Sequence, residues 1–283
     1  MKFSLWTQNG ALNSKPVFDA FRQGALSLGH NCTDNDLDSD VDVIWSVLWS
    51  GRMKENWTVW KRAQDRSKPV IVLEVGGIQR GTTWKVGLNG INRDAYFSNE
   101  GNNSDRANLL SLTLSEWKQN NNGPIIICCQ HDKSLQWTNM PQLSTWITNT
   151  IGTIRQHTNR PIVVRPHPRC SLPQFEISYD NVLRQQPLKV NGTYDSFDFK
   201  YDHAWAIVNW SSNPAVEAVR NGIPVFVGPS SLAWPVGNHS LDNIENPLKP
   251  DRTQWLNDLA HTEWTVQEIA KGIPLKQLTN KLT

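Results

Sequence analysis

Two serines in front of a helix-like segment are the first residues here with a clear chemical use. Ser211 and Ser212 directly precede NPAVEAVRNG (213–222), which has helical spacing and closes at Gly222. The first N–H groups of a helix have no partner within the helix and attract anions. Serine hydroxyls beside them suit a phosphate, so this point predicts a phosphate site. Alternatively, Ser212 or Asn213 caps the helix, and both roles can hold together.

Two further side chains could act beside such a phosphate. Glu217 lies one turn into the same helix, where its carboxylate could accept hydrogen bonds from ribose hydroxyls, or it is an ordinary exposed glutamate. His167 can donate to a phosphate or to a leaving-group oxygen. Arg165 and Arg169 flank this histidine in RPHPR, which favours a binding role over a structural one.

The two motifs together resemble one group of enzymes. RPHP (165–168) followed by NWSSNPAVEAVRNGIPVFVG (209–228) resembles the second domain of GT-B glycosyltransferases related to capsule-polysaccharide, Kdo and bacterial sialic acid transferases. Those families share an HP motif and a later Ser-Ser motif, and both hold the donor nucleotide. The resemblance covers roughly residues 123–270 and implies a nucleotide-sugar donor.

A third polar segment, QHDKS (130–134), follows an apolar run. The resemblance implies a loop here that faces the donor phosphates and the acceptor. Gln130, Lys133 and Ser134 are therefore predicted donor contacts, and Asp132 is a second choice for the catalytic base. An ordinary turn capped by Asp132 explains the segment equally well.

A glutamate in the first half is the first choice for that base. Glu74 ends the apolar run PVIVLEV and precedes two glycines. A carboxylate at a strand end could deprotonate an acceptor hydroxyl as its oxygen attacks the anomeric carbon of the sugar. A strand-end glutamate is equally suited to a salt bridge. We expect the acceptor to be bound by Arg52, Arg80, Trp84, Lys85 and Asn89.

No metal site is predicted. The aspartates of residues 33–42 alternate as in a calcium loop, but Ser39 and Trp45 stand where that loop needs Gly and Glu. We interpret the stretch as a solvated acidic loop. The sequence also lacks GxxxxGK[ST], GxSxG and HExxH. A metal-independent GT-B reaction is therefore favoured, with the nucleotide-sugar donor and no other cofactor.

Alternating apolar and amphipathic segments would position these side chains. Strands are predicted at 40–49, 69–77, 123–130, 160–168, 203–210 and 223–228, and helices at 14–29, 53–66, 141–157, 213–222 and 250–270. Such alternation predicts parallel sheets, whose ligands bind beyond the carboxyl ends of the strands. We predict an α/β GT-B fold: two Rossmann-like domains with parallel sheets facing a central cleft. Residues 1–122 would form the acceptor-side domain, and residues 123–283 the nucleotide-sugar domain with C-terminal helices.

The acceptor remains open between three interpretations. The basic, tryptophan-bearing segment 52–68 could contact phosphates and stack on bases of double-stranded DNA. We lean to this one, a phage enzyme that glycosylates 5-hydroxymethylcytosine. The same segment could instead lie on a membrane in a transferase for capsule or lipopolysaccharide sugars, or be a solvated face with Trp57 and Trp60 in the core. A non-catalytic nucleotide- or carbohydrate-binding module is the third interpretation.

The donor nucleotide is also open. The HP and Ser-Ser pair points to CMP-sugars, whereas Glu217 is placed as the ribose contact of UDP-sugars. A UDP-glucose-like donor is our choice.

Composition sets the broad class. The chain has 283 residues, 38% of them hydrophobic, and a net charge of +2, which is typical of a globular protein and argues neither for nor against nucleic acid. No apolar run is long enough for a transmembrane helix, and MKFSLWTQNGALNSK lacks the core of a signal peptide. The cysteines at 32, 128, 129 and 170 form no CxxC pair, so we expect reduced thiols in a cytoplasmic monomer.

Overall fold

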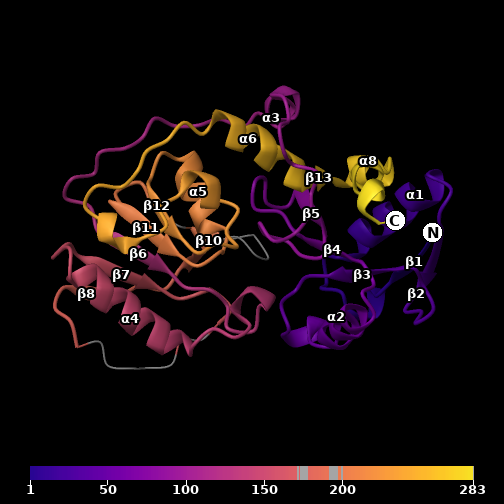
Figure 1. Cartoon of the computed structure of the whole chain (residues 1–283), viewed down its shortest axis with the longest axis horizontal. Coiled ribbons are helices and arrows are strands. Elements are labelled where there is room, and N and C mark those ends of the chain that lie inside the picture. Colours follow the sequence, from indigo (N-terminus) through magenta and orange to yellow (C-terminus); the bar gives the residue numbers. More distant parts are fainter. Residues whose placement is uncertain (171, 173–177, 191–196, 199, 283) are drawn as a thin grey trace. The chain divides into compact units, whose positions relative to one another are not determined.

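The protein divides into two compact units (Figure 1). The computed structural model describes residues 1–170, 172, 178–190, 197–198 and 200–282. Residues 1–110 and 257–283 form the first unit, and residues 111–256 form the second. The predicted division at residue 122 differs from these units. The first unit ends earlier, and the C-terminal residues that we expected in the nucleotide-sugar domain belong to the first unit.

The first unit is built on a six-stranded sheet in the order β13-β5-β4-β3-β1-β2. Neighbours among β2, β1, β3 and β4 are parallel, whereas β5 is antiparallel to β4 and to β13. The strands are β1 (Lys2–Leu5), β2 (Asn31–Asp34), β3 (Val41–Trp45), β4 (Val70–Val75), β5 (Thr83–Leu88) and β13 (Glu263–Thr265). The sequence predicted β3 and β4 but not the other four strands.

Helices pack on both faces of this sheet. On one face, Phe18 and Phe21 of α1 join alternate strand residues such as Leu5, Val43 and Trp45 in a buried core, to which α7 and α8 also contribute. On the other face lies α2. The helices are α1 (Lys15–Ser27), α2 (Asn56–Asp65), α3 (Asp105–Leu109), α7 (Val266–Ala270) and α8 (Ile273–Leu278). The helix predicted at 250–270 is instead α6 (Thr253–Leu259), β13 and α7.

The second unit contains an all-parallel sheet in the order β12-β11-β6-β7-β8. Its strands are β6 (Ile125–Cys128), β7 (Ile162–Arg165), β8 (Val182–Arg184), β11 (Ala206–Asn209) and β12 (Val225–Val227). In chain order this is the 3-2-1-4-5 arrangement of Rossmann-like folds, which reverses direction between β6 and β11. Ligands of such sheets bind at the carboxyl edge beside that switch point.

The core of the second unit follows from its apolar strands. The β6 residues are all buried, and α4 (Leu143–Arg155) packs Ile147, Ile151 and Ile154 against the sheet. Helix α5 (Pro214–Arg220) links β11 to β12, and β9 (Leu188–Lys189) pairs with β10 (Phe197–Asp198). Short 3₁₀ turns lie at Thr7–Asn9, Gly51–Met53, Leu135–Trp137, Trp234–Val236, Leu241–Asn243, Ala260–Thr262 and Thr279–Lys281.

Two properties expected from the composition can be compared with the structure. All four cysteines are free thiols. Within the described part of the chain, we find no helix with the length and apolar character needed to traverse a bilayer.

Candidate functional site

Residues from two separate segments meet at the switch point of the second sheet. Ser211, which follows β11, donates from Oγ to Oε1 of Gln130, which follows β6, at 3.4 Å. Gln130 in turn donates from Nε2 to Oγ of Ser134 at 3.2 Å. All three side chains are buried. The structure therefore brings together three predicted donor-binding residues from two segments 81 residues apart.

Ser212 is held by a residue that the sequence analysis missed. Asn209, buried at the end of β11, donates from Nδ2 to Oγ of Ser212 at 2.5 Å and to the carbonyl oxygen of Cys128 at 3.1 Å. Asn209 thus ties β11 to β6 and fixes the orientation of Ser212. The Asn213 side chain does not cap α5, and that helix has only seven residues, so hydroxyls rather than a long helix dipole supply most of the polarity here.

Two histidines face one another beside these hydroxyls. The rings of His131 and His167 lie 5.1 Å apart in an edge-on arrangement. Nδ1 of His131 accepts from the Lys133 backbone N–H at 3.1 Å, and Nδ1 of His167 accepts from the Arg169 N–H at 3.2 Å. In the neutral ring of His167 the proton therefore sits on Nε2. His167 consequently offers a donor N–H, as its predicted role requires.

The sequence analysis passed over His131, although it lies within QHDKS. Burial lowers the pKa of His131, which favours the neutral ring. Its position could have identified it, because it lies between Gln130 and Ser134, which were both predicted donor contacts.

Arg165 is turned into the second unit. It ends β7, is buried, donates from Nη2 to Oε1 of Gln185 at 3.1 Å, and places its guanidinium 5.4 Å from the centre of the Tyr201 ring. Burial raises the pKa of Cys128 to about 12, and the charges of Arg165 and Glu217 act on the same thiol in opposite directions. Arg165 and Glu217 are thus part of one polar interior behind the carboxyl edge.

The remaining predicted donor contacts lie on the solvent side. The side chain of Lys133 is 63% exposed, with Nζ 4.0 Å from Oδ2 of Asp132, and Arg169 is exposed as well. Oδ1 of Asp132 accepts from Sγ of Cys170 at 3.4 Å. Exposed basic side chains beside a buried hydroxyl cluster are a suitable arrangement for an anionic ligand.

At the opposite, amino edge of this sheet lies a surface hollow of about 400 Å³. It is lined by none of the predicted site residues but by Asn120, Asn121, Asn122, Gly123, Pro124 and His203. The switch point, rather than this hollow, therefore concentrates the chemistry.

In the first unit, Glu74 ends β4 as predicted and belongs to a row of charges across three strands. It stands opposite Lys85 of β5, and Lys85 stands opposite Glu263 of β13. Burial raises the pKa of Glu74, while a Ser46 hydroxyl and the charges of Lys85 and Arg80 oppose that rise. A carboxyl group with a raised pKa is a stronger base once ionised.

Glu263 fixes the loop after β4. Its carboxylate accepts from the N–H groups of Gly77 at 2.7 Å and Ile78 at 3.0 Å, and from Oγ1 of Thr83 at 2.7 Å. A Cβ on Gly76 would lie 2.1 Å from the carbonyl oxygen of Thr83, so this position must be glycine. Sequence analysis missed Glu263 because it lies 186 residues from Gly77.

Three of the predicted acceptor residues have structural positions that differ from the expectation. Trp84 points to the other face of the sheet from Glu74 and packs in the core, 5.8 Å from the ring of Trp45. Oδ1 of Asn89 accepts from the Val70 N–H at 2.9 Å, at the opposite end of β4. Lys85 is buried, donates to the Ile91 carbonyl oxygen at 3.2 Å, and has its pKa lowered by burial. Arg52 and Arg80 are exposed.

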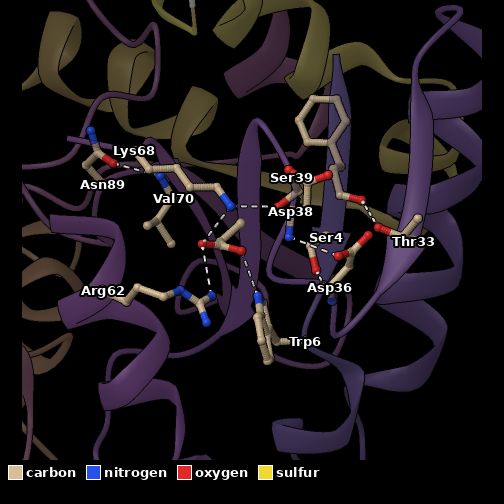
Figure 2. A network of polar contacts seen from close by, with 12 residues as sticks. Ser4, Trp6, Thr33, Asp36, Asp38, Ser39, Arg62, Lys68, Val70 and Asn89 are labelled. Atoms are coloured by element: carbon tan, nitrogen blue, oxygen red, sulfur yellow. Dashed lines mark hydrogen bonds and ion pairs between the residues drawn. The ribbon is translucent and has the colours of Figure 1, made fainter. Parts of the chain in front are cut away.

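The acidic stretch is not uniformly solvated, which corrects its interpretation as a loop. Asp42 lies fully buried within β3 and accepts from Nε1 of Trp6 at 2.8 Å. Its other oxygen lies 3.2 Å from Nζ of Lys68 and 3.6 Å from Nη2 of Arg62 (Figure 2). Two cations of the basic segment are therefore used inside the unit. Asp36 instead pairs with Lys2 at 2.8 Å.

Comparisons with known proteins reveal the fold. No protein-family model matches the sequence, and no curated protein matches it. Among solved structures, the β-Kdo 2,7 transferase of KpsC from Thermosulfurimonas dismutans superposes with a TM-score of 0.58 at 14% identity, covering 98% of this chain and 100% of that one. The β-Kdo 2,4 transferase of KpsC from the same organism gives a TM-score of 0.53 at 11% identity, with coverages of 100% and 98%. The chain has the GT-B fold.

The GT-B fold confirms the predicted fold class: α/β, with two Rossmann-like units. Within it, the carboxyl edge of the second sheet collects Gln130, Ser134, Ser211 and Ser212, with His167 nearby. The carboxyl end of β4 in the first sheet carries Glu74.

Proposed function

We propose that this protein is a glycosyltransferase that moves a sugar from a nucleotide-sugar to a hydroxyl acceptor. One observation carries the proposal. Predicted donor contacts from two distant segments, Gln130 with Ser134 and Ser211, form one hydrogen-bonded cluster at the switch point of a Rossmann-like sheet. That is where such sheets bind nucleotides.

In the proposed reaction, the acceptor oxygen attacks the anomeric carbon while the bond from that carbon to the nucleotide phosphate breaks. Glu74 takes the proton of the acceptor hydroxyl. The departing phosphate gains negative charge, and the Nε2–H of His167 with the hydroxyls of Ser211 and Ser212 donates to it. Lys133 and Arg169 add positive charge at the same edge. None of these steps calls on a metal ion.

A surface glycan is the acceptor that we favour. Two solved structures that superpose over nearly the whole chain are named as β-Kdo transferases. In addition, Arg62 and Lys68 of the basic segment are turned onto Asp42, which leaves fewer cations for a polyanion. For the donor, the HP and Ser-Ser motifs favour a CMP-sugar, and Glu217 favours a UDP-sugar.

Duplex DNA with 5-hydroxymethylcytosine is the second candidate acceptor, because part of the basic segment does face solvent. Arg52, Lys61 and Arg66 are exposed, and so is Trp57, at 41%. Exposed cations with an aromatic ring suit phosphates and flipped or unpaired bases.

The test is a transfer assay with a panel of UDP- and CMP-sugars. Each donor is offered to a Kdo-containing glycan and to duplex DNA with 5-hydroxymethylcytosine, and products are identified by mass spectrometry. We expect one nucleotide class to be consumed and a sugar-sized mass to appear on one acceptor. Glu74→Gln should lower the rate at least about a hundredfold, as loss of a general base does. Glu100→Gln, an exposed glutamate of the same unit, is the matched control.

His167→Ala should also lower the rate, whereas His203→Ala, an exposed histidine at the amino edge, should not. Donor binding without hydrolysis or transfer under all conditions would favour a non-catalytic binding module. Full activity of Glu74→Gln would remove that residue from the reaction and leave Asp132 as the base to test.

A further inference from the structure

Three metal-ligating groups gather at the carboxyl edge of the second sheet. His131 and Asp132 follow β6, and Cys170 lies in the loop after β7. Nδ1 of His131 lies 3.2 Å from Oδ1 of Asp132, and Sγ of Cys170 lies 3.4 Å from that same oxygen. One ligand atom from each of the three residues lies within 4.8 Å of the others. Cys170 was outside every predicted motif, because it follows Asp132 by 38 residues.

These spacings are close to those around zinc. Bonds of about 2.0–2.3 Å from tetrahedral zinc to nitrogen, oxygen and sulfur put neighbouring ligand atoms roughly 3.3–3.6 Å apart. The two measured separations at Asp132 nearly satisfy that requirement without a change of backbone. The third edge, between His131 and Cys170, is at most 4.8 Å long.

The ligand types select among cations. Imidazole with a thiol favours zinc, whereas magnesium and calcium prefer sites made only of oxygen. Three protein ligands leave a fourth position for water or a phosphate oxygen.

We propose that His131, Asp132 and Cys170 bind Zn²⁺. On binding, a sulfur–zinc bond replaces the S–H bond of Cys170, and the proton passes to solvent. Because the thiol must lose its proton to bind zinc, zinc binding weakens as the pH falls. If the proposed function holds, zinc inhibits transfer, because it occupies Asp132 and binds beside His167.

Cobalt titration of the reduced full-length chain tests the site, with a phosphine as reductant. Co²⁺ bound to Cys170 should give the near-ultraviolet charge-transfer absorption of a cobalt–thiolate bond, and Zn²⁺ should bleach it. Cys170→Ser should abolish the band. Cys32→Ser, which alters a half-buried thiol of the first unit, is the matched control and should retain it.

Asp132→Asn keeps the thiol and should weaken cobalt binding at least about tenfold. Thermal unfolding would reveal whether Cys170→Ser misfolds, and in that case Asp132→Asn tests the site independently. Absence of the band in the full-length chain, or a band that survives Cys170→Ser, would overturn the proposal. The titration uses neither donor nor acceptor, so its outcome is separate from that of the transfer assay. Zinc inhibition that persists in Cys170→Ser would disprove only the regulatory consequence.

Discussion

The two units use their polar residues in different ways. In the first unit, polar side chains are bonded to one another inside the fold: Asp42 with Lys68, and Glu263 with the backbone after β4. In the second, Gln130 and Ser211 are bonded at the end of the strands where ligands bind. Substitutions in these first-unit networks should therefore lower stability, and those in the second-unit cluster should weaken binding. Four predictions test this contrast, from the largest expected effect to the smallest.

Asp42→Ala should have the largest effect. It removes the carboxylate but leaves Lys68 and Arg62 partly buried without their partner, and breaking a buried pair in this way costs about 3–5 kcal/mol. Urea unfolding of the two proteins measures the difference. Asp38→Ala, which removes a fully exposed carboxylate 3.8 Å from Lys2, should change stability little. Equal losses in both variants would contradict the network in Figure 2.

Gly76→Ala should have the next largest effect on stability. The new Cβ would meet the Thr83 carbonyl oxygen at 2.1 Å and Oε2 of Glu263 at 2.3 Å, so backbone must move at a cost of about 1–3 kcal/mol. Gly152→Ala in α4 is the contrasting substitution, because its Cβ would meet only the tip of Tyr179. Thermal unfolding should show a loss for the first variant and none for the second.

Ser211→Ala should act on binding rather than on folding. Removing one hydroxyl donor to an anionic ligand should weaken nucleotide binding about tenfold, or about 1.4 kcal/mol. Calorimetric titration with the nucleotide product measures this change. Ser115→Ala, an exposed position of the same unit, provides the comparison. A large drop in unfolding temperature without a change in affinity would place Ser211 among structural residues.

The pH dependence should show the smallest effect. Burial raises the pKa of Glu74 above 4.5, so activity that needs its carboxylate is lost as the pH falls through this raised value. Arg80→Ala removes a charge that favours the carboxylate, and the acidic limb of the rate profile should move upward by less than about one pH unit. If the acidic limb moved to lower pH instead, the assignment of Glu74 as the base would be contradicted.

The raised pKa of Glu74 also affects the stability of the fold. A raised carboxyl pKa means that the folded state holds the proton more tightly than the unfolded state does, so Glu74 contributes less stability once the pH exceeds its folded pKa. Glu74→Gln should therefore be at least as stable as the unmodified protein at neutral pH while losing activity. Unfolding curves at acidic and neutral pH separate the two effects.

The contrast between the units also explains what the sequence could predict. Strands β6, β7, β11 and β12 were predicted because their apolar runs are continuous and end in polar turns. The site residues of this unit lie in those polar turns, so they could be predicted together with the strands. Strands β2 and β13 were missed, since the first is polar and the second is a short segment within a helix-like pattern.

Site residues were missed where their role depends on distant partners. Glu263 acts on a loop 186 residues away, and Asn209 is defined by its bond to the Cys128 carbonyl on another strand. Asp42 looked like one more solvated aspartate, because local composition does not reveal that Arg62 and Lys68 turn toward it. Pairings of this kind are set by tertiary packing rather than by local pattern.

The return of β13 to the first sheet affects the order of synthesis and folding. Residues 111–256 are continuous, so the second unit is fully translated before Glu263 is made. Until then, the N–H groups of Gly77 and Ile78 lack their carboxylate, and β5 has an open edge. An open edge can pair with other chains. During translation the first unit is thus the last to be completed, although its parallel strands are synthesised first.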